Sequence, residues 1–221
     1  MEISNINDLS NLIKEKEKVY TFRKLEQKDV KKIQQLMTKS FVYENQGFII
    51  LKVTEDDLNS ELMFQFYDFM VQENLSYGAF HGDELVSACL TYDLSNNNNF
   101  NYQGPEPSKV MQEIQKFVDI LLDKYADAKN IQKKEIAYLS HLATRADHFQ
   151  QQLAVSCAYL SAEECRKLGF KQMITEAAHI GTQKSFSKIF KNFEKFKEIK
   201  ELKGQPVDIV SLIGAFNTQQ Y

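Results

Sequence analysis

The order of helical and strand-like segments predicts an α/β (α+β) fold, in which a central mixed sheet carries helices on both faces. Three observations lead to this prediction. Segments with apolar residues at helical spacing alternate with short β-rich runs along the chain. Gly82-Asp83 separates two such runs, which is typical of a β-hairpin. A strand, a helix and a strand follow one another between residues 135 and 177, which favours an adjacent parallel pair.

The first third of the chain predicts three helices and one strand. An amphipathic helix is expected over residues 3–17, then a strand over 19–25 and helices over 27–40 and 58–71. Apolar residues at helical spacing in the first two helices are Ile3, Ile6, Leu9, Leu12, Ile13, Val30, Ile33, Leu36 and Met37. The third helix is rich in Phe, Tyr and Met, which indicates core packing rather than a cofactor site.

The middle of the chain predicts the hairpin, a loop and a helix. The hairpin strands are expected over 75–80 and 85–94. Residues 95–107, SNNNNFNYQGPEP, have the composition of a polar surface loop. A helix is expected from Pro107-Ser108 to about Ala126, because apolar residues recur there at helical spacing.

The last third predicts the strand–helix–strand unit, a short helix and two closing strands. Gly169 ends one helix and Gly204 joins the closing strands. The expected strands cover 135–144, 171–177, 195–202 and 206–215, and the expected helices cover 151–168 and 182–191. We expect one buried cluster from this unit, formed by Leu142, Leu153, Ala154, Leu160, Leu168, Phe170 and Ile174.

Composition and charge limit the class of protein. The chain has 221 residues with 43% apolar content, which suits a helical extension over 1–18 and one domain over 19–221. A net charge of −3 argues against nucleic acid as a partner. The N-terminus has no secretory or transit pattern, and no apolar run reaches the ~18 residues of a membrane span. We therefore expect a cytoplasmic protein.

Three cysteines, Cys89, Cys157 and Cys165, lack any metal-binding spacing and leave an odd count. Cys157 and Cys165 share a predicted helix, in which eight residues rise about 12 Å, too far for a disulfide. We expect reduced, buried thiols and no metal site.

The segment 141–154, HLATRADHFQQQLA, joins a predicted strand directly to a predicted helix. Such a junction suits an anion, because a helix start offers unpaired N–H groups and the positive end of the helix dipole. The glycines and lysine of a Walker loop or dinucleotide fingerprint are absent. Three consecutive glutamines, Gln150, Gln151 and Gln152, occupy the turn instead.

Leu142 to Ala154 resemble, without a gap, the pattern Leu-Ala-Val-His-Pro-x-Tyr-Arg-Gly-x-Gly-Ile-Ala of the GNAT superfamily of N-acetyltransferases, in its arylalkylamine (dopamine-type) branch. TFRKLEQKDVKKIQQLM at 21–37, the hairpin and SFSKIFKNF at 185–193 resemble further family segments in the same order. The resemblance covers about residues 19–215. It implies a mostly antiparallel sheet of six or seven strands, and acetyl-CoA as co-substrate.

The sequence departs from the family pattern at the turn itself. Phe149 stands at the family's Arg position, and Gln150 and Gln152 stand at its two glycines. Glycine lets a backbone approach a diphosphate closely and adopt positive φ. Two interpretations follow: either the backbone amides of Gln151, Gln152, Leu153 and Ala154 still cradle the diphosphate, or the pocket has lapsed.

The resemblance also implies roles for single residues. Backbone groups of Leu142, Ala143 and Thr144 would face the acetyl carbonyl, and the turn from Phe149 to Ala154 would hold the diphosphate. Glu44, in a segment (Ser40–Asn45) that resembles the branch with Asn45 replacing Pro, is the candidate base. Ser185 and Ser187 match positions near the thiol leaving group, although serines there are often helix caps. The remaining candidates are His141 and His148 as proton relays and Tyr159, for which core packing is favoured.

Two functions from different classes follow. The chain is an acetyl-CoA-dependent N-acetyltransferase that acts on a small amine by direct attack, or it is an inactive protein of the same fold that serves as a structural or binding subunit. The N-terminal helix, absent from a minimal family domain, would favour a protein partner in the second case. Transfer of a longer acyl group is a third possibility.

Overall fold

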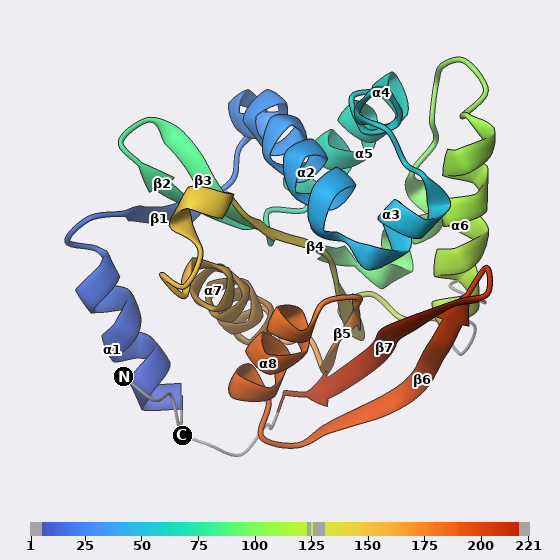
Figure 1. Cartoon of the computed structure of the whole chain (residues 1–221). Helices are drawn as coiled ribbons and strands as arrows, with labels where there is room; N and C mark the ends of the chain where they lie inside the picture. The colour runs from blue at the N-terminus through green and yellow to red at the C-terminus, as the bar shows by residue number, and fades with distance from the viewer. Residues whose placement is uncertain (1–5, 123–124, 126–130, 217–221) are drawn as a thin grey trace.

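The computed structural model describes residues 6–122, 125 and 131–216 (Figure 1). The described strands form one seven-stranded sheet in the order β1-β2-β3-β4-β5-β7-β6. They are β1 (Thr21–Lys24), β2 (Tyr77–His81), β3 (Glu84–Asp93), β4 (Ile136–Thr144), β5 (Gln172–Ala177), β6 (Phe193–Leu202) and β7 (Gln205–Ala215). Among these strands β4 and β5 pair in parallel and the other neighbours pair antiparallel, which confirms the predicted mixed, mostly antiparallel sheet.

Helices cover both faces of the sheet, as predicted. They are α1 (Ile6–Lys16), α2 (Val30–Glu44), α3 (Gln46–Leu51), α4 (Glu55–Leu58), α5 (Glu61–Gln72), α6 (Lys109–Leu121), α7 (Leu153–Lys167) and α8 (Ile180–Ile189). Figure 1 shows α2 to α6 on one face and α1, α7 and α8 on the other. The interior is accordingly two apolar layers, one on each side of the central strands. Within the described residues, no helix is long and apolar enough to cross a membrane.

Two short helices escape the sequence prediction. The helix expected over 27–40 begins as a 3₁₀ turn and runs on to Glu44, and α3 and α4 follow it directly. Caps start both short helices: the Asn45 side chain accepts from Phe48 N (3.2 Å), and Thr54 accepts from Asp57 N. Helices this short have too few turns for an apolar period to be visible. The expected helix ends at Ile3 and Ala126 lie outside the described residues.

The predicted buried cluster is partly wrong. Leu153, Phe170 and Ile174 are buried, and Leu142, Ala154 and Leu160 are half-buried. Leu168 is 40% exposed, because it stands at the end of α7 where Gly169 (φ 86°) turns the chain and brings Phe170 inward instead. Ile174 lies in the opposite apolar layer from Leu153, because successive strand residues point to opposite faces.

The three thiols, Cys89, Cys157 and Cys165, are buried and free. Cys89 is on β3 and the other two are on α7, and all three belong to the apolar layer between α7 and the sheet. Burial raises the pKa of the Cys89 thiol to about 12 and raises those of Cys157 and Cys165 as well. The prediction that these cysteines are buried and form no disulfide is therefore confirmed.

The N-terminal helix packs on its own domain. Leu9, Leu12 and Ile13 on its apolar face are buried in the layer that contains α7. The hydroxyls of Ser10 and Tyr159 lie 3.1 Å apart, so Tyr159 contacts α1. The apolar face of α1 is thus occupied within the chain, and any partner of this helix would have to use its polar face.

A charged contact fixes the start of α2, the helix that carries Glu44 at its other end. Arg23 donates two hydrogen bonds to the carboxylate of Asp29 (2.7 and 2.8 Å), and its guanidinium lies 3.9 Å from the centre of the Phe80 ring. Asp29 is 1% exposed and also accepts from Glu26 N. Burial would raise the pKa of the Asp29 carboxyl, but these hydrogen bonds and the charge of Arg23 outweigh it and lower the pKa.

We expect Asp29→Asn to lower the free energy of unfolding by roughly 1.5–3 kcal/mol, the range for hydrogen bonds to charged groups. Because the folded pKa lies below the unfolded value, near 3.9, this contribution is fully present above that value and is lost as the pH falls through the folded pKa. Urea unfolding of both proteins between pH 2 and 7 measures the difference.

Lys28→Gln is the matched control, because its ion pair with Glu26 (2.7 Å) is exposed on both sides and contributes less than about 1 kcal/mol. An Asp29 variant no less stable than the Lys28 variant would contradict the assignment.

Candidate active site

The central parallel pair comes apart halfway along its length. β4 and β5 are in register from Ile136↔Gln172 to Leu139↔Thr175. Beyond Leu139, β4 stays paired with β3 as far as Thr144, and β5 stays paired with β7 as far as Ala177. The facing edges of the two strands are therefore free of each other. A cavity of about 1370 Å³ lies at this opening and is lined from both layers of helices.

A β-bulge stands where the strands separate. The register of β4 with β3 passes from Leu139↔Thr91 to His141↔Leu90, so Ser140 is the extra residue. A bulge bends the strand and leaves its extra residue unpaired. The backbone edge of β4 from Ser140 to Thr144 thus borders the cavity, and it includes the predicted cofactor-binding residues Leu142, Ala143 and Thr144.

His141 lies in the cavity wall as a neutral imidazole. It is 9% exposed and stacks on Phe41, with ring centres 5.2 Å apart and ring planes 9° apart. Burial lowers the pKa of its imidazole to about 4. Its Nδ1 lies 2.8 Å from the Ser140 hydroxyl. His141 can therefore exchange a hydrogen bond at neutral pH but is a weak base.

His148 is held in place by two neighbours. Its Nε2 lies 3.0 Å from Arg145 Nη2, and its Nδ1 lies 3.0 Å from the Tyr20 hydroxyl. Because a guanidinium only donates, Nε2 must accept and Nδ1–H must donate to Tyr20. Both ring nitrogens are thereby used, which leaves His148 no free nitrogen with which to relay a proton.

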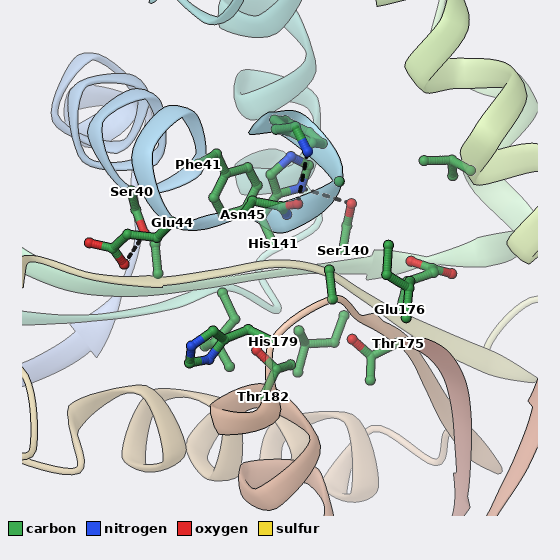
Figure 2. Close-up of a pocket in the computed structure, with 18 of the residues that line it drawn as sticks. Ser40, Phe41, Glu44, Asn45, Ser140, His141, Thr175, Glu176, His179 and Thr182 are labelled. Atoms are coloured by element: carbon green, nitrogen blue, oxygen red, sulfur yellow. Dashed lines mark hydrogen bonds between the residues drawn. The ribbon is translucent and has the colours of Figure 1, made fainter. Parts of the chain in front are cut away.

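Glu44 reaches the cavity from the last turn of α2. Figure 2 shows it beside Ser40, above and to the left of His179, the residue that caps α8. Burial raises the pKa of the Glu44 carboxyl, although the Ser40 hydroxyl, 3.4 Å away, and the nearby His179 oppose the shift. A carboxylate with a raised pKa at the entrance of a cavity is suited to accept a proton.

The two serines of α8 point in different directions. Ser185 lines the cavity, and its hydroxyl donates to Gly181 O (2.8 Å). Ser187, predicted to be catalytic, is exposed, donates to Lys184 O (2.9 Å) and does not line the cavity. The helical turn therefore brings Ser185 rather than Ser187 toward any ligand.

The glutamine turn keeps the backbone shape that glycine would favour. Gln150 has φ 64° and Gln152 has φ 61°, both in the left-handed region, and these are the two positions where the family pattern has glycine. Gln151 is not among the residues with positive φ. This conformation costs a residue with a side chain about 1–2 kcal/mol. The turn therefore has two residues with positive φ although neither is glycine.

The start of α7 is open to the cavity. Gln152 is its N-cap residue yet makes no capping hydrogen bond, and its Oε1 is buried without a partner. The N–H groups of Leu153, Ala154 and Val155 belong to the first helical turn, where no carbonyl of the helix can accept from them. Phe149, Gln150, Gln152, Leu153 and Ala154 all line the cavity, whereas the Gln151 side chain accepts from Lys16 of α1 (3.3 Å).

Two features of the cavity escape the sequence prediction. Lys184 and Lys188, one helical turn apart on α8, line it and form no ion pair with any described residue. Glu176 on β5 also lines it, and burial raises the pKa of this carboxyl to about 8. The charge of Glu176 inside the predicted strand over 171–177 was the available signal for the second feature.

We expect Gln150→Gly and Gln152→Gly to leave stability unchanged or to raise it by up to ~1 kcal/mol. Relief of the left-handed strain offsets the larger entropy of the unfolded chain. Gln151→Gly is the control at a position without positive φ and should lower stability by roughly 0.5–1 kcal/mol. Urea unfolding ranks the three variants, and equal losses in all three would contradict the described turn.

Comparisons with known proteins agree with this geometry. No protein-family profile and no curated protein sequence matches the chain. Among solved structures, arylalkylamine N-acetyltransferase 2 from Aedes aegypti superposes with a TM-score of 0.71 at 16% identity, over 90% of this chain and 99% of that one. The C-terminal condensation domain of Ebony, in complex with beta-alanyl-dopamine, gives 0.69 at 12% identity, over 89% and 99%.

The PaiA N-acetyltransferase from Thermoplasma acidophilum, in complex with coenzyme A, gives a TM-score of 0.55 at 10% identity, over 89% of this chain and 99% of that one. At identities this low, the superpositions establish the fold only, and the chemistry has to be argued from the residues of the site. The resemblance inferred from the turn is thus confirmed at the level of architecture: this chain has the GNAT fold, and arylalkylamine N-acetyltransferases are among its structural neighbours.

Proposed function

We propose that the protein is an acetyl-CoA-dependent N-acetyltransferase that acts on a small amine. One observation carries the proposal: the turn before α7 keeps two left-handed residues, Gln150 and Gln152, although neither is glycine. Four other residues with side chains also have positive φ, namely Lys52, Asn74, Lys134 and Lys203, but only Gln150 and Gln152 among these six line the cavity. Strained backbone gathered at a cavity is typical of a ligand-binding site. The turn opens on the same cavity as the separated edges of β4 and β5.

The residues present fit the chemical groups of acetyl-CoA. The free amides at the start of α7 suit a diphosphate, because they combine N–H donors with the positive end of the helix. Lys184 and Lys188 bring two positive charges to the same cavity, in place of the Arg that Phe149 replaces. The edge of β4 from Leu142 to Thr144 offers backbone groups to the extended part of the molecule. Coenzyme A bound to neighbours of this fold supports the assignment.

The reaction would proceed by direct attack. Glu44, ionised, takes one proton from the ammonium of the acceptor, and the freed nitrogen attacks the thioester carbon. Backbone N–H groups at the Ser140 bulge stabilise the charge that develops on the carbonyl oxygen. The C–N bond forms, the C–S bond breaks, and the second nitrogen proton passes to the leaving thiolate. Glu44 then returns its proton to water.

An inactive protein of the same fold is the second candidate. Phe149 favours it, because the aromatic ring is 45% exposed where an Arg would bring a permanent charge to the diphosphate. The condensation domain of Ebony supports the general point that one architecture carries different functions. For location we keep the cytoplasm, on the ground that the three cysteines are buried and form no disulfide.

Calorimetric titration of acetyl-CoA into the purified protein separates the two candidates. The enzyme requires saturable binding with a Kd in the micromolar range. Lys184→Ala combined with Lys188→Ala should weaken it by about two to four decades, because each lysine contributes a charge-assisted contact of about one to two decades. Phe149→Arg should tighten it for the same reason. Lys171→Ala, an exposed lysine outside the cavity, is the control. Absence of binding to all four proteins would favour the inactive scaffold.

Glu44→Gln should lower turnover by about 10²-fold, the usual contribution of a general base, and leave acetyl-CoA affinity unchanged. Because the base must be ionised and its pKa is raised, wild-type kcat/KM should fall as the pH drops through that pKa. Glu55→Gln is the control, since Glu55 pairs with Tyr43 on the surface outside the cavity. Equal turnover in the two variants would remove Glu44 from the mechanism. Release of coenzyme A thiol measures the rate.

A further inference from the structure

A second carboxyl group, that of Glu176, faces the same cavity from its interior. Glu176 follows Thr175, the last residue of β5 that is in register with β4. Its side chain shares a sheet face with Ile174, two residues earlier, and therefore points into the layer of α2 to α6. Figure 2 shows Glu44 and Glu176 at opposite sides of the labelled residues, with His141 and Ser140 between them.

The carboxyl of Glu176 is only half satisfied. Tyr138 on β4 donates a short hydrogen bond to Oε2, while Oε1 is buried and has no hydrogen-bond partner. No cation is among the groups that shift its pKa. In its ionised form this carboxyl lacks a second donor and a positive charge. A primary ammonium group supplies both.

The space between the two carboxyl groups suits a cationic chain. Its walls include Phe41, Phe66, Tyr92 and Phe100, and the Phe66 and Phe100 ring centres are 5.0 Å apart. Aromatic faces attract ammonium groups and tolerate methylene groups. The other titratable groups that line the cavity are Tyr92 and Tyr138 on the sheet, Lys116 and Asp119 on α6, and His141, His148, His179, Lys184 and Lys188. None of them forms a hydrogen bond with Glu176 apart from Tyr138.

We propose that Glu176 anchors a second ammonium group of the acceptor, so that the preferred acceptor is an aliphatic diamine whose other nitrogen is acetylated. This inference rests on the proposed function and names its substrate class. Glu44 acts on the reacting nitrogen, and Glu176 holds the distant one. Tyr138 is the positioning residue, because its hydrogen bond to Oε2 fixes the carboxyl and leaves Oε1 without a partner.

The anchor predicts a proton change on binding. Burial raises the pKa of Glu176 to about 8, so at pH 7 the carboxyl is mostly protonated. A bound ammonium favours the ionised form and lowers this pKa, so binding at pH 7 releases close to one proton. Diamine affinity therefore rises with pH until about pH 8. The hydrogen bond from Tyr138 lowers the pKa, so its loss in Tyr138→Phe moves that rise to higher pH.

Steady-state kinetics with paired acceptors test the proposal. The pairs are 1,3-diaminopropane, 1,4-diaminobutane and 1,5-diaminopentane, each against the monoamine of equal chain length. In the wild-type protein, at least one diamine should exceed its monoamine in kcat/KM by about ten-fold or more, the size of one charge-assisted contact. In Glu176→Gln that ratio should fall to about one. Glu44→Gln, the matched control, should lower both rates and keep the ratio.

A ratio near one in the wild-type protein, or a ratio that Glu176→Gln leaves unchanged, would overturn the anchor. Tyr138→Phe keeps the ring that packs on Tyr92 (5.2 Å between centres) and provides a second variant if Glu176→Gln does not fold. Its diamine preference should appear only at higher pH than in the wild type. An unshifted profile would contradict the role of Tyr138 and Glu176.

Failure of the proposed function can be told apart from failure of the anchor. If no amine is acetylated, calorimetry of 1,4-diaminobutane at pH 7 in two buffers of different ionisation heat still measures proton release. Release of close to one proton by the diamine, absent with 1-aminobutane and absent in Glu176→Gln, supports the anchor without any turnover. Equal binding of the two amines, or no binding, overturns it.

Discussion

The separation of β4 from β5 is the constraint on which the rest of the site depends. Backbone N–H and C=O groups in a protein interior are costly to leave unpaired, so a gap between central strands is stable only beside water or a ligand. The bulge at Ser140 and the continued pairing of β5 with β7 hold this gap open. The helix start at Leu153, the end of α2 at Glu44 and the lysine face of α8 all border it.

Periodicity in the sequence predicted most of the architecture, because long segments show their buried faces plainly. The strand–helix–strand unit around α7 was predicted with its parallel pair, and the hairpin turned where Gly82 indicated. Short helices such as α3 have no visible period and were missed. Leu168 was misplaced because the end of a helix is set by one residue of backbone geometry rather than by pattern.

Site residues were predictable only where local sequence determines them. Glu44 reaches the cavity because α2 runs on to it. Ser185 lines the cavity and Ser187 does not, because residues two apart in a helix point to opposite sides of it. Substitution of both glycines gave no sign that Gln150 and Gln152 would keep positive φ. The environment of Glu176 depends on Tyr138, which lies on the neighbouring strand. The order of residues along the chain does not show this contact.

The buried thiols have a consequence for how this chain can be observed. Acyl transfer from a thioester liberates one free sulfhydryl per turnover, and aromatic disulfide reagents report it as colour. Cys89, Cys157 and Cys165 are buried in the layer between α7 and the sheet, and their raised pKa values keep thiolate scarce at neutral pH. The cysteines of the folded protein therefore do not react with such reagents. Its cysteine thiols react only on unfolding, so a colour change in the folded protein would report the proposed reaction, and a later one would report loss of the fold.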